Sequence, residues 1–348
     1  MKALTFDGPG RKSWNTAPDP AIQEPQDAIV RIDAVTICGT DLHILKGDVP
    51  EVEPGRVLGH EAVGTVVDIG NSVSEVAVDD RVLVSCISGC GRCVYCRRGM
   101  YGQCRRGGGW VLGHLIDGVQ AEYARIPFAD HGLYKLPSSV TDEQALMLAD
   151  ILPTSYEVGV RNGQVQPGDV VAVVGAGPIG LAAVATARLY SPRKIVVIDP
   201  AESRLKRALE DFGADITVDP SVDDAARAIA DLADGLGADV AIEAVGIPET
   251  FEQCVELVRP GGHVANIGVH GKAATLHLET AWIKDLTITT GLVDTYSTPT
   301  LLKLLADGLI DTDAFVTHRF RLDDFMAAYD VFTDAAGNDA VKVALRRA

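Results

Sequence analysis

Long apolar runs alternate with amphipathic segments in the second half of the chain. Residues 170–174 form an uninterrupted apolar run, which is typical of a strand buried on both faces. Helices are expected at 178–190, near 201, near 223 and at 251–258, and further strands at 195–198, 216–218, 240–242 and 263–267. This alternation predicts a doubly wound α/β domain, in which helices cover both faces of a parallel sheet.

The first half of the chain has a different pattern. Short β-branched runs at 28–32, 62–67 and 81–84 are separated by glycine and proline, and no long helical period is found before 141–148. These features predict a β-rich, barrel-like unit. The tail from about residue 292 mixes strand and helix patterns, and we expect it to return to this unit. The predicted domains are therefore 1–152 with 293–348, and 153–292.

Composition limits the partners of the chain. With 348 residues, 47% hydrophobic and 23% charged, it fits two folded domains. The net charge of −17 would repel nucleic-acid phosphates and anionic membranes, so we expect neither as a partner. No apolar run approaches the ~18 residues of a membrane span, and the N-terminus lacks the pattern of a signal peptide. We therefore expect a cytoplasmic protein.

A glycine-rich turn follows the apolar run at 170–174. Gly175, Gly177 and Gly180 fit the pattern G-x-G-x-x-G, with Pro178 and Ile179 opening a helix. The pattern alone is weak, but its place between a strand and a helix indicates a dinucleotide site. Gly175 would permit the tight turn, Gly177 the approach of a pyrophosphate, and Gly180 the close packing of the helix on the sheet. The first amides of the helix would then hold the phosphates.

Asp199 ends the next strand, about 20 residues after Gly180. A carboxylate there can accept hydrogen bonds from the adenosine ribose hydroxyls and would repel a 2′-phosphate, which favours NAD over NADP. Arg204 lies nearby in the sequence and would soften that preference. The alternatives are a glycine turn that serves packing alone and an Asp199 side chain that caps a helix.

Five of the seven cysteines fall between Cys86 and Cys104. Four of them have the spacing C-x2-C-x2-C-x7-C on a glycine-rich segment: Cys90, Cys93, Cys96 and Cys104. Four thiolates can close a tetrahedral zinc shell, and in a reducing compartment such a cluster indicates a metal site rather than disulfides. We expect a structural zinc that holds this lobe. Unliganded thiols in a reduced loop are the alternative.

A second group of ligand-type residues is scattered along the chain. Cys38 lies in C-G-T-D at 38–41, and His60 and Glu61 lie in G-H-E at 59–61. Each motif alone is only suggestive, since a lone buried Cys or His is usually structural. Together with the cysteine lobe and the glycine turn, they make the sequence resemble the zinc-containing medium-chain dehydrogenase/reductase family over its whole length, and bacterial alcohol dehydrogenases in particular.

The resemblance implies a catalytic zinc held by Cys38, His60 and Asp150. Asp150 stands where many animal members have Cys, and bacterial secondary-alcohol enzymes use Asp there. Glu61 corresponds to a direct ligand in some members and to a displaceable group in others. Because a thiolate and two carboxylates together would overcharge the ion, Glu61 is expected to exchange with water or substrate. Zinc with three protein ligands keeps a position open for chemistry.

The resemblance also assigns the surroundings of that zinc. Thr40 and His43 would form a relay that carries the alcohol proton to solvent. The expected contacts of the nicotinamide end of the cofactor are Thr154, Val269, Leu292 and Val293. The expected lining of the substrate pocket is Cys86, Ile87 and Trp110. The alternatives are a turn hydroxyl for Thr40, a surface imidazole for His43 and plain core positions for the pocket residues.

The implied enzyme is a NAD-dependent alcohol dehydrogenase with two zinc ions per subunit, acting on a small primary or secondary alcohol, aldehyde or ketone. The implied fold is a GroES-like β-rich catalytic domain plus a Rossmann domain, in a homo-oligomer for which a tetramer is favoured. Polyol, threonine or formaldehyde dehydrogenases of the same superfamily are alternatives, because they differ only in the pocket. The paired metal motifs argue against a zinc-free quinone or enoyl reductase. The nucleotide motif and the charge argue against a zinc-ribbon binding module.

Overall fold

The computed structural model describes residues 1–347 and divides them into two compact units. The first unit begins with residues 1–153 and resumes at residue 294, and the second comprises residues 154–293. These junctions lie one residue from the predicted ones. Within the described residues, no helix is both long and apolar enough to cross a membrane.

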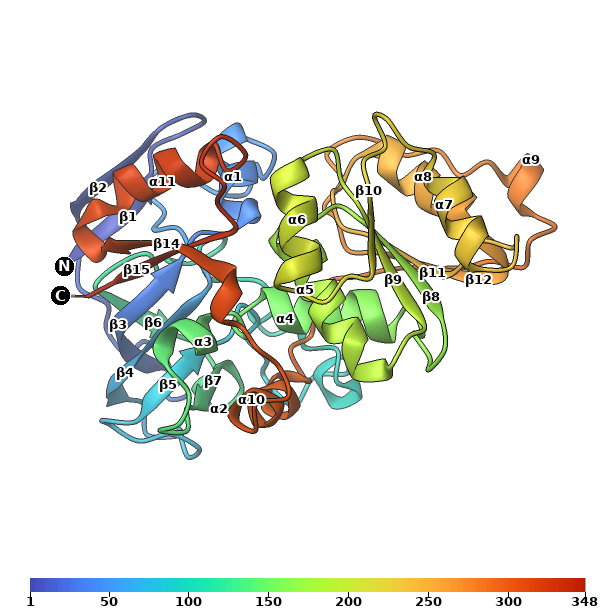
Figure 1. Ribbon diagram of the computed structural model, residues 1–348. Coiled ribbons are helices and arrows are strands. Elements are labelled where there is room, and N and C mark those ends of the chain that lie inside the picture. Colours follow the sequence, from blue (N-terminus) through green and yellow to red (C-terminus); the bar gives the residue numbers. More distant parts are fainter. Residues whose placement is uncertain (348) are drawn as a thin grey trace. The chain divides into compact units, whose positions relative to one another are not determined.

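The second unit contains a six-stranded sheet in which all neighbouring strands are parallel (Figure 1). In spatial order the strands are β10 (Ile216–Val218), β9 (Lys194–Ile198), β8 (Val170–Val174), β11 (Ala238–Glu243), β12 (Val258–Asn266) and β13 (Thr287–Thr290). Numbered along the chain this order is 3-2-1-4-5-6, the Rossmann arrangement. The predicted doubly wound parallel sheet is therefore confirmed.

Helices cover both faces of this sheet. In Figure 1, α5 and α6 lie on one side of the strands and α7 and α8 on the other. Their bounds are α5 (Pro178–Ala187), α6 (Glu202–Glu210), α7 (Ala225–Leu232) and α8 (Pro248–Leu257), with a short α9 (Leu278–Ala281), a π-helix at Ser155–Arg161 and a 3₁₀ turn at Arg188–Tyr190. All five residues of β8 are buried, as the uninterrupted apolar run predicts.

The first unit is built mainly from antiparallel strand pairs, and a parallel pair in the tail completes its main sheet. Its main sheet has the order β14-β15-β3-β4-β5-β7, with β6 also paired to β3, and β1 and β2 form a separate pair. The strands are β1 (Lys2–Phe6), β2 (Lys12–Thr16), β3 (Ala28–Thr36), β4 (Ala62–Ile69), β5 (Arg81–Val84), β6 (Tyr123–Ile126), β7 (Leu133–Lys135), β14 (Val316–Arg321) and β15 (Lys342–Arg346). Thus the tail pairs with the N-terminal part of the chain, β15 beside β3 (Figure 1).

Short helices connect these strands. They are α1 (Gly39–Lys46), α2 (Ala129–Gly132), α3 (Asp142–Leu146), α4 (Ile151–Thr154), α10 (Thr298–Ala306) and α11 (Phe325–Thr333), with 3₁₀ turns at Cys96–Arg98, Tyr101–Gln103, Asp313–Phe315 and Leu322–Asp324. The sequence pattern did not predict α1, because only two of its residues, Asp41 and Ile44, are buried and no apolar stripe results. Gly47 ends this helix in the left-handed conformation.

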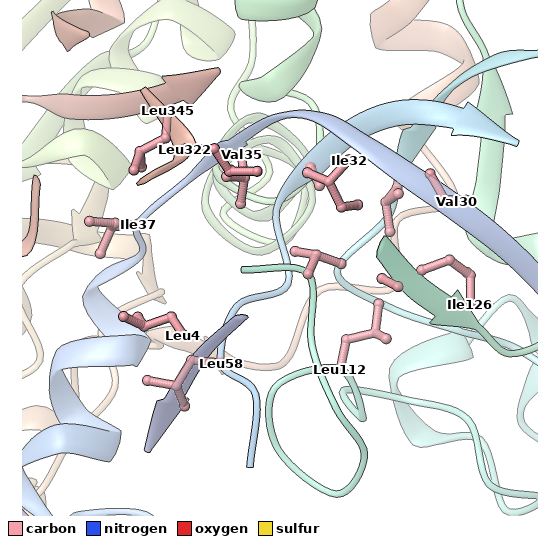
Figure 2. Close-up of a cluster of buried hydrophobic side chains, with 14 of the residues drawn as sticks. Leu4, Val30, Ile32, Val35, Ile37, Leu58, Leu112, Ile126, Leu322 and Leu345 are labelled. Carbon is pink, nitrogen blue, oxygen red and sulfur yellow. The ribbon is translucent and has the colours of Figure 1, made fainter. Parts of the chain in front are cut away.

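The core of the first unit joins residues from both ends of the chain. Figure 2 shows Leu4 and Val35 from the N-terminal strands in the same buried cluster as Leu322 and Leu345 from the tail. Each fully buried side chain of this size contributes about 1.5–3 kcal/mol relative to an exposed one. The tail is therefore part of the first unit by packing as well as by strand pairing.

Candidate active site

Three residues from separate segments of the first unit bring ligand atoms together. Cys38 lies between β3 and α1, His60 comes just before β4, and Asp150 comes directly before α4. One side-chain atom from each lies within 4.8 Å of the others. Asp150 Oδ2 is 3.5 Å from Cys38 Sγ and 3.4 Å from His60 Nε2. Sulfur, imidazole nitrogen and carboxylate oxygen together are a donor set that suits zinc.

Burial and mutual contact change the protonation of these groups. Burial, with the nearby Glu61 and Asp150 carboxylates, raises the pKa of the Cys38 thiol. Burial lowers the pKa of His60, but hydrogen bonds to Asp150 and Cys38 outweigh burial and raise this pKa well above its usual value. A divalent cation at this position would favour the deprotonated forms of all three groups.

A buried polar network lies behind the three residues. Asp41 Oδ2 accepts hydrogen bonds from the Cys38 amide and from Gln120 Nε2, each at 2.9 Å, and Gln120 Oε1 accepts one from the Tyr329 hydroxyl at 2.8 Å. Within residues 1–347, His60 Nδ1 and Asp41 Oδ1 are both buried without a hydrogen-bond partner. Metal-binding histidines normally donate their second N–H to a carboxylate, a carbonyl or water, and among the described residues His60 Nδ1 does not make this orienting hydrogen bond.

Glu61 is bound to a lysine and does not join the three donor atoms. Glu61 Oε2 accepts a 2.6 Å hydrogen bond from Lys342 Nζ, and both side chains are 1% exposed. Lys342 also donates to the Ile37 carbonyl at 3.0 Å. Lys342 thus holds one oxygen of Glu61, whereas Glu61 Oε1 is buried without a hydrogen-bond partner among residues 1–347. The role of Glu61 as an exchangeable zinc ligand stays a prediction.

Thr40 and His43 lie on α1, directly after Cys38. Thr40 Oγ1 is 3.6 Å from Cys38 Sγ. His43 Nδ1 is 2.8 Å from Asp48 Oδ2 in a part-exposed position. Because an ionised carboxylate can only accept, Nδ1 carries the proton and Nε2 is the free nitrogen of this ring. Asp48 escaped sequence analysis, since its spacing of five from His43 follows no known motif.

Two of the three expected pocket residues, Cys86 and Trp110, contact candidate zinc ligands, and the third, Ile87, is buried. Cys86 Sγ is 3.6 Å from Asp150 Oδ1, and Ile87 is 1% exposed. The Trp110 ring stacks on His114, with centroids 4.2 Å apart, and meets the His60 ring edge-on at 6.2 Å. Trp110 thus places a large apolar surface beside one candidate ligand.

The four lobe cysteines form a second compact group. Their sulfur atoms all lie within 4.8 Å of one another, and the sulfurs of Cys90 and Cys96 are 3.9 Å apart. The backbone amides of Cys96 and Arg105 lower the pKa of Cys93 to about 6, whereas burial and the Cys93 sulfur raise that of Cys96 to about 12. The amide donors at Cys93 stabilise its thiolate, and four sulfurs this close together fit a closed zinc site.

The glycine turn of the second unit has the properties that a dinucleotide requires. Gly175 has φ +103, a conformation that favours glycine. A Cβ on Gly180 would lie 1.8 Å from the Gly175 carbonyl oxygen, so no side chain fits there. A Cβ on Gly177 would meet nothing within 4 Å, which leaves space for a ligand at the start of α5. Pro178 and Ile179 open this helix as predicted.

Asp199 stabilises the same turn. Its Oδ2 accepts a hydrogen bond from the Ala176 amide and its Oδ1 one from the Ala201 amide, both at 2.8 Å. Arg204 Nη1 lies 3.8 Å from Asp199 Oδ2. Asp199 therefore contacts the start of α6, as the capping alternative supposed, and it also holds the glycine turn. Each oxygen keeps a lone pair for a further donor.

The four expected nicotinamide contacts differ in exposure. Val269 and Leu292 are exposed, Thr154 is half-buried, and Val293 is buried. Val269 lies beyond β12 and Leu292 beyond β13, at the carboxyl ends of parallel strands, where ligands bind in folds of this class. Their part in cofactor binding stays a prediction.

Comparison with known proteins identifies the family. Residues 24–138 match the alcohol dehydrogenase GroES-like domain, and residues 178–307 match the zinc-binding dehydrogenase model. An alcohol dehydrogenase of Cupriavidus necator is 38% identical over 99% of this chain and 98% of its own length. This chain belongs to the zinc-containing medium-chain dehydrogenase/reductase family. The GroES-like fold expected for the first unit of this dehydrogenase is thereby confirmed.

Solved structures carry the same fold. Zinc dependent alcohol dehydrogenase 2 from Streptococcus pneumonia is 48% identical, with a TM-score of 0.95 over 100% of this dehydrogenase and 98% of that chain. A putative zinc-binding dehydrogenase from Sinorhizobium meliloti, solved with NADP, is 30% identical (TM-score 0.87; 99% and 98% covered). An alcohol dehydrogenase from Escherichia coli, solved with NADH, is 28% identical (TM-score 0.88; 99% of both covered). Relatives of this dehydrogenase thus bind either nicotinamide cofactor.

Sequence analysis missed several residues around the three donors. Lys342 could have been found from the sequence, because a single lysine interrupts the apolar run 340–345. A lysine buried in such a run requires a partner of opposite charge. Asp41 also had a signal, since its position three residues after Cys38 is that of a side chain that bonds back to a helix start. Gln120 and Tyr329 had none, because they meet only through the tertiary fold.

Proposed function

We propose that this dehydrogenase transfers a hydride between NAD and a small primary or secondary alcohol, aldehyde or ketone. The observation that carries the proposal is the approach of Cys38, His60 and Asp150 to within 4.8 Å of one another. Three protein ligands leave zinc a free position, which distinguishes a catalytic site from a closed structural one. When bound there, the ion supplies Lewis acidity to the reacting carbon–oxygen group.

Thr40 and His43 are assigned to proton transfer. The Thr40 hydroxyl lies beside Cys38 and can exchange hydrogen bonds with the alcohol oxygen. Asp48 holds the His43 ring with Nε2 free, so this nitrogen can accept the proton and release it to solvent. Trp110, beside His60, is assigned to the apolar wall that favours a small uncharged substrate.

The glycine turn and Asp199 are assigned to the cofactor. The open space at Gly177 and the first amides of α5 suit a pyrophosphate. Asp199 has acceptor capacity left for ribose hydroxyls, and its negative charge disfavours a 2′-phosphate, which supports NAD. Arg204 lies beside the Asp199 carboxylate, which partly neutralises the positive charge of the guanidinium. Arg204 is therefore less able to bind a 2′-phosphate.

A second zinc and self-association complete the proposal. The four-cysteine group supports a structural zinc, which gives two ions per chain. For the homo-oligomer, with a tetramer favoured, the support is an apolar surface on the second unit. Leu278, Trp282 and Ile283 are 61%, 72% and 68% exposed there, and such patches mark protein contacts.

Initial-rate measurements of the zinc-loaded protein test the function. The panel comprises simple primary and secondary alcohols, a polyol, threonine and formaldehyde, each with NAD and with NADP. We expect reduction of NAD with simple alcohols. Turnover of the polyol, threonine or formaldehyde alone would reject the substrate class, and preference for NADP would reject the cofactor.

Asp199→Asn tests the assigned ribose contact. It keeps the shape of the side chain and removes its charge. We expect kcat/KM with NAD to fall about tenfold, the effect of one charge-assisted hydrogen bond. We expect little change with NADP. Equal losses with both cofactors would mean that Asp199 only supports the turn.

A further inference from the structure

Asp150 turns its two carboxylate oxygens towards different groups. Oδ2 lies 3.5 Å from Cys38 Sγ and 3.4 Å from His60 Nε2, so it faces the candidate metal position. Oδ1 accepts a hydrogen bond from the Cys86 thiol, with 3.6 Å between the sulfur and the oxygen. The carboxylate therefore presents one oxygen to the metal and the other to a protein side chain.

Backbone hydrogen bonds fix the segment that carries Cys86. The Cys86 N–H donates to the carbonyl of Ala149, the residue before Asp150, at 3.0 Å. The Ser85 N–H donates to the Gly132 carbonyl at 2.9 Å, and the Ile87 N–H donates to Ser85 Oγ at 3.2 Å. Cys86 is 3% exposed. Its thiol is thus held against Asp150 by two connections, one through the backbone and one through the side chains.

The geometry does not make Cys86 a direct ligand. In the part of the chain that the structure describes, the atoms within 4.8 Å of one another belong to Cys38, His60 and Asp150, and the Cys86 sulfur is not among them. The Cys86 sulfur contacts Asp150 Oδ1, whereas Oδ2 is the oxygen beside Cys38 and His60. Its contact with the site therefore runs through the carboxylate.

We propose that Cys86 is a positioning residue that holds Asp150 Oδ1, so that Oδ2 alone is presented to the metal. The proposal rests on the catalytic metal site proposed above. A carboxylate bound through both oxygens would occupy the position that the substrate needs, and a hydrogen bond on Oδ1 opposes that arrangement. Partners of this kind orient metal ligands in other proteins.

Two substitutions at Cys86 separate the effect of the hydrogen-bond donor from that of the side-chain volume. Cys86→Ala removes the donor, and Cys86→Ser keeps an O–H donor on a slightly shorter bond. Cys254→Ala is the matched control, because Cys254 is also a fully buried thiol but lies on α8 in the core of the second unit. Zinc affinity is measured by chelator titration with metal analysis, and Cys38→Ala identifies the ion that belongs to the catalytic site. Absorption spectra of the cobalt-loaded proteins report the coordination number.

We expect Cys86→Ala to weaken zinc binding at this site about tenfold or more and to shift the cobalt spectrum towards a higher coordination number. Cys86→Ser is expected to stay within about threefold of the wild type, and Cys254→Ala to match it in both readouts. If Cys86→Ala is too unstable to purify, Cys86→Val supplies an apolar side chain of larger volume for the same comparison with Cys86→Ser.

The failures of the two proposals are distinguishable. If the wild type and Cys38→Ala hold the same number of zinc ions, the catalytic metal site itself is wrong. If the wild type holds the additional ion and Cys86→Ala or Cys86→Val keeps its zinc affinity and cobalt spectrum, the site stands and the positioning role of Cys86 is overturned. A loss as large in Cys86→Ser as in Cys86→Ala would also overturn it, since the donor would then not matter.

Discussion

Lys342 illustrates how a single residue couples the tail to the site. It lies on β15 among buried apolar residues, and its ammonium donates hydrogen bonds to Glu61 Oε2 and to the Ile37 carbonyl. Burial raises the pKa of Glu61, and the Lys342 ammonium opposes this shift. A buried pair of this kind gives little net stability, but removal of one partner leaves an uncompensated charge.

Lys342→Met should therefore lower the free energy of unfolding by about 3–5 kcal/mol. The double variant Lys342→Met/Glu61→Gln should recover most of this loss, because no charge is then left unpaired. Denaturant unfolding of the zinc-loaded proteins measures both. A double variant as unstable as the single one would show that packing, not charge, decides the effect.

Asp215 gives a pH-dependent prediction. Partial burial raises the pKa of this carboxyl, but the Ile195 amide and the Arg188 guanidinium outweigh burial and lower it. A lowered pKa in the folded state contributes stability that is present above the unfolded value of about 3.9 and is lost as pH falls through the folded value. Asp215→Asn should thus destabilise the protein by about 1–3 kcal/mol at neutral pH and by less below pH ~4.

Thermal unfolding at several pH values measures this difference, with Asp231→Asn on the exposed face of α7 as the control. We expect the control to follow the wild type at every pH. A loss in Asp215→Asn that is constant from neutral to acidic pH would contradict the charge-based account.

At the scale of single residues, sequence predicts chemistry better than contacts. Cys38 and His60 could be proposed from their motifs, and Asp150 from a family resemblance. That Asp150 meets Cys86, and that Glu61 meets Lys342, depends on segments far apart in the chain. Such pairs require the tertiary fold, because side chains of many residue types could have filled the same space.

Among the elements, the strands of the second unit were the most predictable. Fully buried parallel strands are uninterrupted apolar runs, and these stand out in the sequence. The predicted helix 178–190 ends at Ala187 before a 3₁₀ turn, and that at 251–258 starts earlier, at Pro248. Short capped helices such as α1 were missed, because their stability comes from caps rather than from an apolar stripe.

The cysteine lobe gives a prediction at the element scale. The small buried cluster of this lobe consists of the sulfurs of Cys90, Cys93 and Cys96, packed by a few aromatic rings. With so little apolar surface, we expect the lobe to depend on a bound metal for order. Removal of zinc by a strong chelator should therefore increase amide exchange at residues 90–104, while β8 and β11 stay protected.

Hydrogen exchange with and without zinc measures this effect, and zinc re-addition is the control for irreversible damage. Unchanged protection of residues 90–104 after complete zinc removal would contradict a structural metal in the lobe.

At the scale of the whole molecule, the charge of −17 constrains self-association. Two copies repel each other unless the contact surface is itself free of excess charge. The segment 276–285 comes close to this condition, because its charged residues sum to only −1 (Glu279, Lys284 and Asp285). It also carries four exposed apolar side chains: Leu276, Leu278, Trp282 and Ile283. Beside it, β13 is the last strand in the order of its sheet.

Trp282→Glu should therefore reduce the oligomeric state, because it places a charge in the exposed apolar surface. Val222→Glu is the control, since Val222 is 78% exposed in the loop between β10 and α7, outside this segment of the chain. Light scattering coupled to size-exclusion chromatography measures the mass of each. If both variants keep the mass of the wild type, this surface is not the interface.

Metal stoichiometry tests the central claim most directly. We predict that the purified, zinc-saturated protein holds two zinc ions per chain and that His60→Ala holds one, with the four-cysteine lobe still occupied. Mass spectrometry of the native protein with elemental analysis gives both numbers. A wild type that holds a single zinc, retained in full by His60→Ala, would contradict a catalytic metal between Cys38, His60 and Asp150.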